Sequence, residues 1–269
     1  MENVEIARAL NAYADVLDIH GEPPSLVTLD DIRGDLQMHS TWSDGRHTIE
    51  EMARACHGRG YEYCAITDYS KATRIARGLD TAAFTKQWDE IARVRQRLDG
   101  YVVLAGVELD ILPDGSLGLS DDILERFDIV VASVHSKLNM TKMQMTKRIL
   151  KALLHPAVAI LAHPTGRQIR KRKPIAVDFD AVFHAAKEYD VALKLNAQPQ
   201  RLDLSDAQVY RARELGVRIA IGTDAYSVDQ LRFMQYGIDQ AQRVWLEREH
   251  VLNAMSWAQL QQWLKHRRS

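Results

Sequence analysis

The sequence has few cysteines, no long apolar run and almost no net charge, and each of these shortages excludes a class of protein. Cys56 and Cys64 are the only cysteines among 269 residues, and they form neither a CxxC motif nor a disulfide-rich pattern, which favours a reducing compartment. No apolar run approaches the ~18 residues that a membrane-spanning helix needs. The first residues, MENVE, are acidic and lack the basic and apolar regions of a signal peptide. We therefore expect a soluble, cytoplasmic protein without a membrane partner.

Acidic and basic side chains nearly cancel, with a formal net charge of −1, so no general electrostatic field attracts nucleic acids. Any binding of anions must come from a local cluster of basic residues. Residues 170–173, RKRK, form one such cluster. It is compatible with a solvated loop and, equally, with a loop that contacts phosphate groups or a nucleic-acid backbone.

Short apolar segments alternate with amphipathic segments from residue 35 almost to the end, which predicts a βα repeat and a parallel sheet. The expected strands are 35–38, 63–67, 102–107, 128–134, 158–162, 191–196 and 218–223. The expected helices are 48–59, 81–98, 141–153, 178–189 and 205–215. The length suits a single α/β-barrel domain. A sheet closed into a barrel is favoured over an open sheet because polar residues follow every strand.

The two ends of the chain differ from this repeat. Apolar residues at helical spacing over 4–18 predict an amphipathic helix, and the Gly-Pro-containing stretch that ends at Pro24 predicts a short linker. We expect residues 1–24 to form this helix and linker, and residues 25–269 to form the barrel with its C-terminal helices. Residues 228–264 predict two or three helices that pack on the barrel, and the last five residues predict a frayed, solvated end.

Side chains of the types that bind metals recur just after the predicted strands. They are His39, Asp44, Glu108, His135, His163 and Asp224. A lone histidine at a strand end is more often a hydrogen-bonding residue than a ligand. The joint occurrence of His135, His163 and Glu108 in equivalent positions nevertheless favours one shared pocket, because a barrel brings its strand ends to one face. Asp44, in WSDG, is compatible with either a turn or a ligand.

Imidazole and carboxylate ligands of this kind hold zinc or manganese. Such an ion lowers the pKa of a bound water and polarises a phosphoryl oxygen, so we expect no catalytic side chain beyond the activated water. Arg167 lies close to His163 in the sequence, and Asn196 and Arg201 follow another strand. These three are the candidate phosphate-binding residues, which predicts a phosphate ester as the substrate.

The motifs together resemble the polymerase and histidinol phosphatase (PHP) domain, specifically the one at the C-terminus of bacterial family X DNA polymerases. The motifs are GDLQMHSTWSDG at 34–45, YCAITD at 63–68, LAGVE at 104–108, VASVH at 131–135, AHPTGR at 162–167, RLDLSD at 201–206 and TDA at 223–225. The resemblance implies a distorted (β/α)7 TIM-like barrel over about residues 26–265. The first residues resemble the N-terminus of such polymerases, but the nucleotidyltransferase core has no counterpart, so we do not expect DNA polymerisation.

The resemblance also implies a cluster of three metal ions that hydrolyses phosphoesters, including DNA 3′ ends. Transferred residue by residue, the first ion takes position 37 with His39, Glu108 and Asp224, the second takes Glu108, His135 and His163, and the third takes Asp44 with positions 69 and 226.

The sequence departs from this pattern at Gln37, Tyr69 and Tyr226, where family members have histidine. A glutamine amide is a weak oxygen ligand, and a neutral tyrosine is a poor one. The third site keeps only Asp44 and is expected to be empty, the first keeps three of four ligands, and the second is complete. We therefore expect one or two ions.

Two functions are compatible with these residues. The favoured one is a metal-dependent phosphoesterase with a reduced centre, acting on phosphomonoesters or DNA 3′ ends. The alternative is a catalytically inactive PHP domain that binds phosphate or DNA ends or serves as a scaffold, because the loss of three histidines together is what relaxed catalytic need would leave. The sequence indicates no partner protein.

Overall fold

The computed structural model describes residues 24–71 and 78–268. The helix expected at 4–18 and most of the linker before Pro24 lie outside this part of the chain. Over the described residues, no helix has both the length and the apolar character needed to cross a bilayer.

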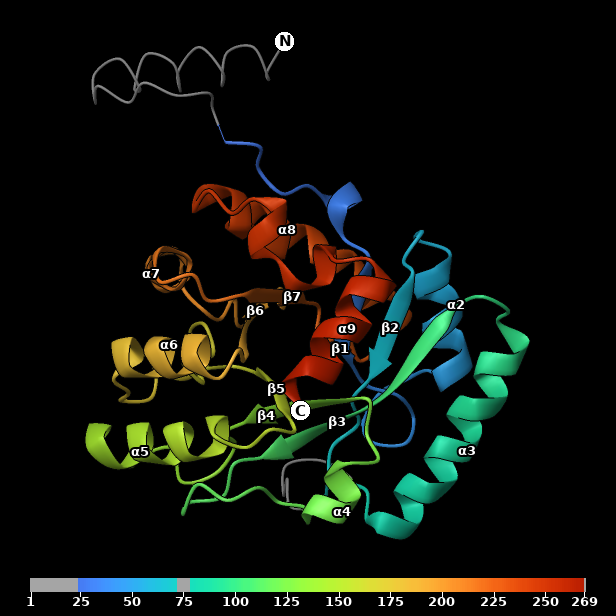
Figure 1. The fold of residues 1–269 in the computed structure, drawn as a ribbon, viewed down its shortest axis with the longest axis horizontal. Coiled ribbons are helices and arrows are strands. Elements are labelled where there is room, and N and C mark those ends of the chain that lie inside the picture. The colour runs from blue at the N-terminus through green and yellow to red at the C-terminus, as the bar shows by residue number, and fades with distance from the viewer. Residues whose placement is uncertain (1–23, 72–77, 269) are drawn as a thin grey trace.

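Seven parallel strands lie side by side in their order along the chain, which confirms the predicted barrel (Figure 1). They are β1 (Gly34–Met38), β2 (Tyr63–Ile66), β3 (Val102–Asp110), β4 (Ile129–Ser133), β5 (Val158–Leu161), β6 (Ala192–Asn196) and β7 (Ile219–Gly222). The predicted strands all form, and the main difference is β3, which ends at Asp110 rather than at residue 107. Parallel strands in consecutive order place all their carboxyl ends on one face, where a barrel carries its functional residues.

The barrel closes between β1 and β7 with little strand pairing. One parallel bridge joins Met38 to Ala225. Below it the side chain of Asn253 fills the seam: its amide donates to the carbonyls of Gly34 and Ile221, both at 2.8 Å, and its oxygen accepts from the Ile221 N–H at 3.0 Å. Asn253 therefore satisfies main-chain groups that would otherwise be buried without partners.

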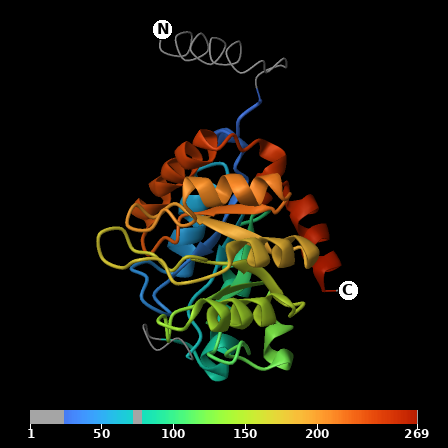
Figure 2. The same ribbon diagram turned by 90° about the vertical axis from the view of Figure 1, so that its left-hand side faces the viewer.

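Helices cover the outside of the strands (Figures 1 and 2). The predicted ones form as α2 (Ile49–His57), α3 (Thr81–Arg97), α5 (Lys142–Leu153), α6 (Phe179–Glu188) and α7 (Asp206–Glu214), and a short α4 (Asp121–Leu124) was not predicted. Thr48 and Ser205 make capping boxes with Glu51 and Gln208. Such side chains begin helices because they satisfy N–H groups that have no partner within the helix.

The C-terminal segment adds further helices around the barrel. It contains the 3₁₀ turns η2 (Val228–Phe233), η3 (Arg248–His250) and η4 (Leu252–Ala254) and the helices α8 (Met234–Arg243) and α9 (Trp257–Arg267), while η1 (Leu29–Asp31) precedes β1. The prediction of a frayed, solvated end is wrong for Arg267 and Arg268, while Ser269 lies outside the described residues. Arg267 donates to the carbonyls of Tyr189 and Val158, and Arg268 donates to that of Phe127. These bonds hold the end of α9 against the barrel.

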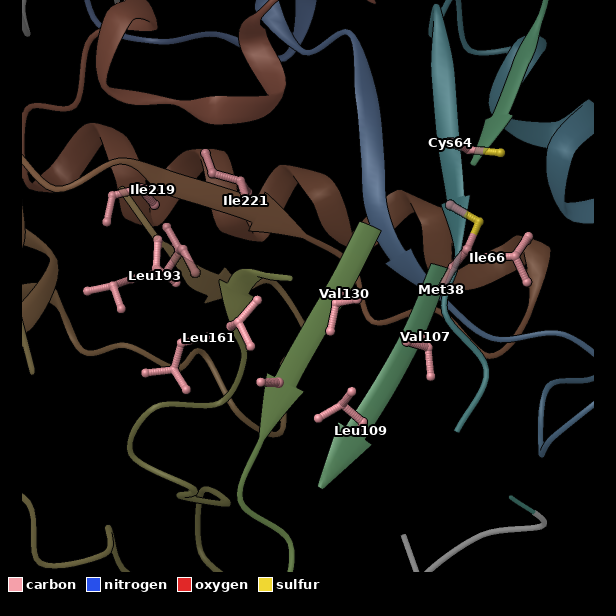
Figure 3. Close-up of a cluster of buried hydrophobic side chains, with 14 of the residues drawn as sticks. Met38, Cys64, Ile66, Val107, Leu109, Val130, Leu161, Leu193, Ile219 and Ile221 are labelled. Carbon is pink, nitrogen blue, oxygen red and sulfur yellow. The ribbon is translucent and has the colours of Figure 1, made fainter. Parts of the chain in front are cut away.

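Alternation along the strands divides the apolar side chains between two clusters. Met38, Ile66 and Val107 belong to the larger cluster (Figure 3), with helix residues such as Met52 and Ile91. A second cluster gathers strand residues of the opposite parity, among them Ala65, Leu104, Val131, Ala192 and Ala220, with Trp263 and Leu264 of α9. This second cluster fills the barrel interior at the end opposite the carboxyl ends of the strands. The polar inward residues occupy the carboxyl end.

Replacing Asn253 with alanine should destabilise the fold by about 2–3 kcal/mol, because the main-chain groups of Gly34 and Ile221 lose their buried partners. Urea unfolding followed by circular dichroism measures this change. The control is Gln262→Ala on the exposed face of α9, which should stay within about 0.5 kcal/mol of the wild type. Equal effects of the two substitutions would contradict the role assigned to Asn253.

Candidate metal centre

The structure brings five of the predicted residues into one largely buried cluster, called the pocket, at the carboxyl ends of the strands. Each comes from the end of a different strand, at the inward-facing position that alternation provides. They are His39 after β1, Glu108 in β3, His135 after β4, His163 after β5 and Asp224 after β7. Their ligand atoms fall into two groups, and the atoms of each group lie within 4.8 Å of one another.

The first of these groups consists of Glu108, His135 and His163. Oε1 of Glu108 lies 3.2 Å from Nε2 of His135 and 3.4 Å from Nε2 of His163. Ser133 also donates to this oxygen, at 2.8 Å. The amide of Asn196 lies 2.8 Å from Nδ1 of His163 and fixes the ring, whereas Nε2 of His163 is buried without a hydrogen-bond partner. Two imidazoles and a carboxylate that converge in this way suit zinc and similar divalent ions.

The second group consists of His39, Glu108 and Asp224. Nε2 of His39 lies 3.3 Å from Oε2 of Glu108 and 3.3 Å from Oδ1 of Asp224. Burial acts to lower the pKa of His39, but its bonds with Asp224 and Glu108 outweigh burial and raise that pKa to about 10. Glu108 belongs to both groups, with one carboxylate oxygen directed to each.

Gln37 and Lys194 complete the second group in a way that the sequence did not reveal. The amide nitrogen of Gln37 donates to Glu108 and, at 3.2 Å, to Asp224. Its amide oxygen accepts a 2.7 Å hydrogen bond from Nζ of Lys194, which also lies 3.8 Å from Oδ1 of Asp224. The sequence does contain one signal of this arrangement: Lys194 lies in the buried strand β6, two residues before Asn196, and so faces the same side of the strand as Asn196.

The position expected for a third ion is filled by aromatic side chains. The hydroxyls of Tyr69 and Tyr226 lie 2.5 Å apart, and both rings stack on His39 at centroid distances of 4.4 and 4.5 Å. Burial raises the pKa of both tyrosines well above the usual value, so the phenols stay neutral. Asp44 is exposed and belongs to neither ligand group among the described residues. These residues do not suit a third ion.

The three candidate phosphate-binding residues occupy different environments. Arg201 lies at the edge of the pocket, with Nε 4.0 Å from Oδ2 of Asp224 and 16% of its side chain exposed. Asn196 donates to Asp224 at 3.0 Å. The guanidinium of Arg167 instead donates to the carbonyls of Arg201 and Leu202, so it holds the loop that carries Arg201.

The backbone at two of these positions is held in the left-handed region. His163 has a φ of 47° and Asp224 a φ of 53°, and neither is glycine. Such a conformation costs free energy and occurs where the surrounding structure requires it, often at functional sites. Here it coincides with a turn at the end of β5 and of β7 that accompanies the entry of the two side chains into the pocket.

Glu108→Gln should weaken zinc binding by about tenfold or more, which is ~1.4 kcal/mol, because it removes the charge that both ligand groups share. Isothermal titration calorimetry with zinc on metal-stripped protein measures the change. Asp44→Asn is the matched control and should leave the affinity unchanged. An equal loss in the control would show that Asp44 takes part in the site.

The chain is similar to known proteins in both sequence and fold. The model of the PHP domain matches residues 35–198. The DNA polymerase/3′-5′ exonuclease PolX of Bacillus subtilis is 41% identical over 261 residues, which cover 97% of this chain but only 45% of that protein. This chain thus spans less than half the length of that relative.

Two further proteins are similar. A probable phosphatase of Thermoanaerobacter sp. (strain X514) is 30% identical over 197 residues, which cover 69% of this chain and 76% of that protein. The fold resembles histidinol phosphate phosphatase of Lactococcus lactis, solved with zinc, L-histidinol and phosphate, at a TM-score of 0.54 and 13% identity, covering 79% of this chain and 93% of that one. The extent of the domain match and the identity to its relatives confirm the resemblance: the chain belongs to the PHP domain family.

Proposed function

We propose that the protein is a metal-dependent phosphoesterase of the PHP type with a reduced centre of one or two divalent ions, zinc or manganese. The observation that carries this proposal is the convergence of Glu108, His135 and His163, with Nε2 of His163 buried and without a partner. The similar proteins named as phosphatases and the zinc in the Lactococcus lactis structure support it.

Some residues of the pocket would bind the ion, and others would bind the phosphate. Glu108, His135 and His163 would hold an ion, which supplies Lewis acidity for attack on a phosphoryl group when bound. Arg201 provides a partly exposed guanidinium beside this group and suits the anionic oxygens of a phosphate. Asn196 fixes the ring of His163, and Arg167 fixes the backbone at Arg201.

The side chains beside His39 bear on the class of substrate. Tyr69 and Tyr226 stack on His39 and occupy the volume beside it, which favours a small phosphomonoester. DNA 3′ ends remain the second class to test, because the Bacillus subtilis relative is named as a 3′-5′ exonuclease.

A catalytically inactive domain that binds phosphate or DNA ends is the second candidate. It is favoured by one observation: Gln37 already satisfies Glu108 and Asp224 with hydrogen bonds. A pocket whose carboxylates are bonded in this way has less need of an ion to be stable. This candidate predicts phosphate binding without turnover.

Chelation should abolish hydrolysis of 4-nitrophenyl phosphate and of 3′-labelled DNA, and added zinc or manganese should restore it. His135→Ala should lower the rate by about 100-fold or more, because the ion contributes several kcal/mol to transition-state stabilisation. His184→Ala on the exposed face of α6 is the control. Bound metal without turnover on either substrate would instead support the inactive domain.

A further inference from the structure

The ammonium group of Lys194 lies inside the barrel, next to the ligands that the first ion would use. Its side chain is fully enclosed by the strands. Nζ donates to the amide oxygen of Gln37 at 2.7 Å and lies 3.8 Å from Oδ1 of Asp224. Two of the four positions assigned to the first ion, Gln37 and Asp224, therefore already face a positive charge.

The neighbouring strand leaves room for this lysine. A Cβ atom at Gly222 of β7 would lie 3.0 Å from Cε of Lys194 and 3.5 Å from Oδ1 of Asp35. The absence of a side chain there lets the aliphatic part of Lys194 cross the barrel toward β1. Gly222 thus has a steric reason to be glycine, since the 3.0 Å approach to Lys194 is tighter than usual packing.

Several buried carboxylates surround the ammonium group of Lys194, and their charge needs compensation. Asp35, Glu108 and Asp224 are all buried, and carboxylates enclosed in a protein are stable only when they are paired or hydrogen-bonded. A divalent ion would meet this requirement in a complete centre. Lys194 contributes part of that charge from a side chain of the strand itself.

The orientation of Gln37 agrees with this arrangement. Its oxygen is the one atom of the amide that could coordinate an ion, and that oxygen accepts from Lys194. Its nitrogen is directed to Glu108 and Asp224 as a donor. Gln37 therefore donates hydrogen bonds to Glu108 and Asp224, and its oxygen, bonded to Lys194, does not serve as a metal ligand.

We propose that the Lys194 ammonium, relayed by the Gln37 amide, takes the place of the first divalent ion and leaves a single-ion centre at Glu108, His135 and His163. The proposal rests on the proposed function to the extent that this second site binds an ion. Lys194 is a positioning residue in this scheme: it neutralises and orients Asp224 and Gln37 beside the ion.

The test is the number of zinc ions bound per chain, measured by elemental analysis after gel filtration of zinc-saturated protein. The wild type should bind one ion. Lys194→Met keeps the length of the side chain and removes its charge, so it should bind two. Lys194→Arg, which keeps the charge, should bind one, and Lys147→Met on the exposed face of α5 controls for the loss of a lysine elsewhere.

A second readout is thermal unfolding with and without a chelator. In chelator, Lys194→Met should unfold at a lower temperature than Lys147→Met, because its carboxylates lose their cation, and zinc should restore most of the difference. If Lys194→Met folds only in the presence of zinc, its ion count is taken on protein folded with zinc and then desalted.

The outcomes separate this inference from the proposed function. Two ions in the wild type, or one in both the wild type and Lys194→Met, would overturn the role of Lys194 and leave the phosphoesterase intact. No ion in the wild type and one in Lys194→Met would support the role of Lys194 while contradicting the second site. No ion in either protein would overturn both.

Discussion

Glu108 carries a negative charge in the interior of the barrel, and the arrangement of the pocket follows from the need to compensate it. Burial acts to raise the pKa of this carboxyl group, but the close approach of His135, His163 and His39 holds that pKa well below its usual value. One oxygen faces His135 and His163, and the other faces His39. The side chain therefore joins two potential ion sites and makes each depend on the other.

The two sites compensate their charge in different ways. On the side of His163, the buried Nε2 of that residue has no hydrogen-bond partner and remains available to an ion. On the side of Asp224, the groups already present include Lys194 and Gln37. Burial and the charge of Lys194 act in opposite directions on the pKa of Asp224, and the net effect holds that pKa below its usual value. The pocket thus contains internal cations as well as metal ligands.

The tyrosines place a different constraint on the same pocket. Tyr69 and Tyr226 bond to each other through their hydroxyls and cover His39 with their rings. A histidine in either position would direct a ligand nitrogen to the pocket, whereas a neutral phenol adds apolar surface and one hydrogen bond. The two tyrosines therefore make the region beside His39 a packed one rather than a set of metal ligands.

The sequence by itself determined the elements of the fold and the residues that reach the site. Strands and helices follow from local periodicity and from capping residues such as Thr48, and these signals lie within a few neighbouring residues. His39, Glu108, His135, His163 and Asp224 could be grouped because each directly follows or ends an apolar strand, and parallel strands end on one face. The length of α9 and its bonded end, by contrast, were not predictable from a basic C-terminal sequence.

Only the tertiary structure decided which atoms those residues present to one another. Lys194 and Gln37 are 157 residues apart in the sequence, as are Tyr69 and Tyr226, so no local pattern links them. The use of Arg167 for main-chain carbonyls, rather than for an open pocket, also depends on a distant loop. Periodicity places a side chain on a face of the barrel, but the direction of a hydrogen bond and the balance of buried charge depend on contacts between strands that fold together.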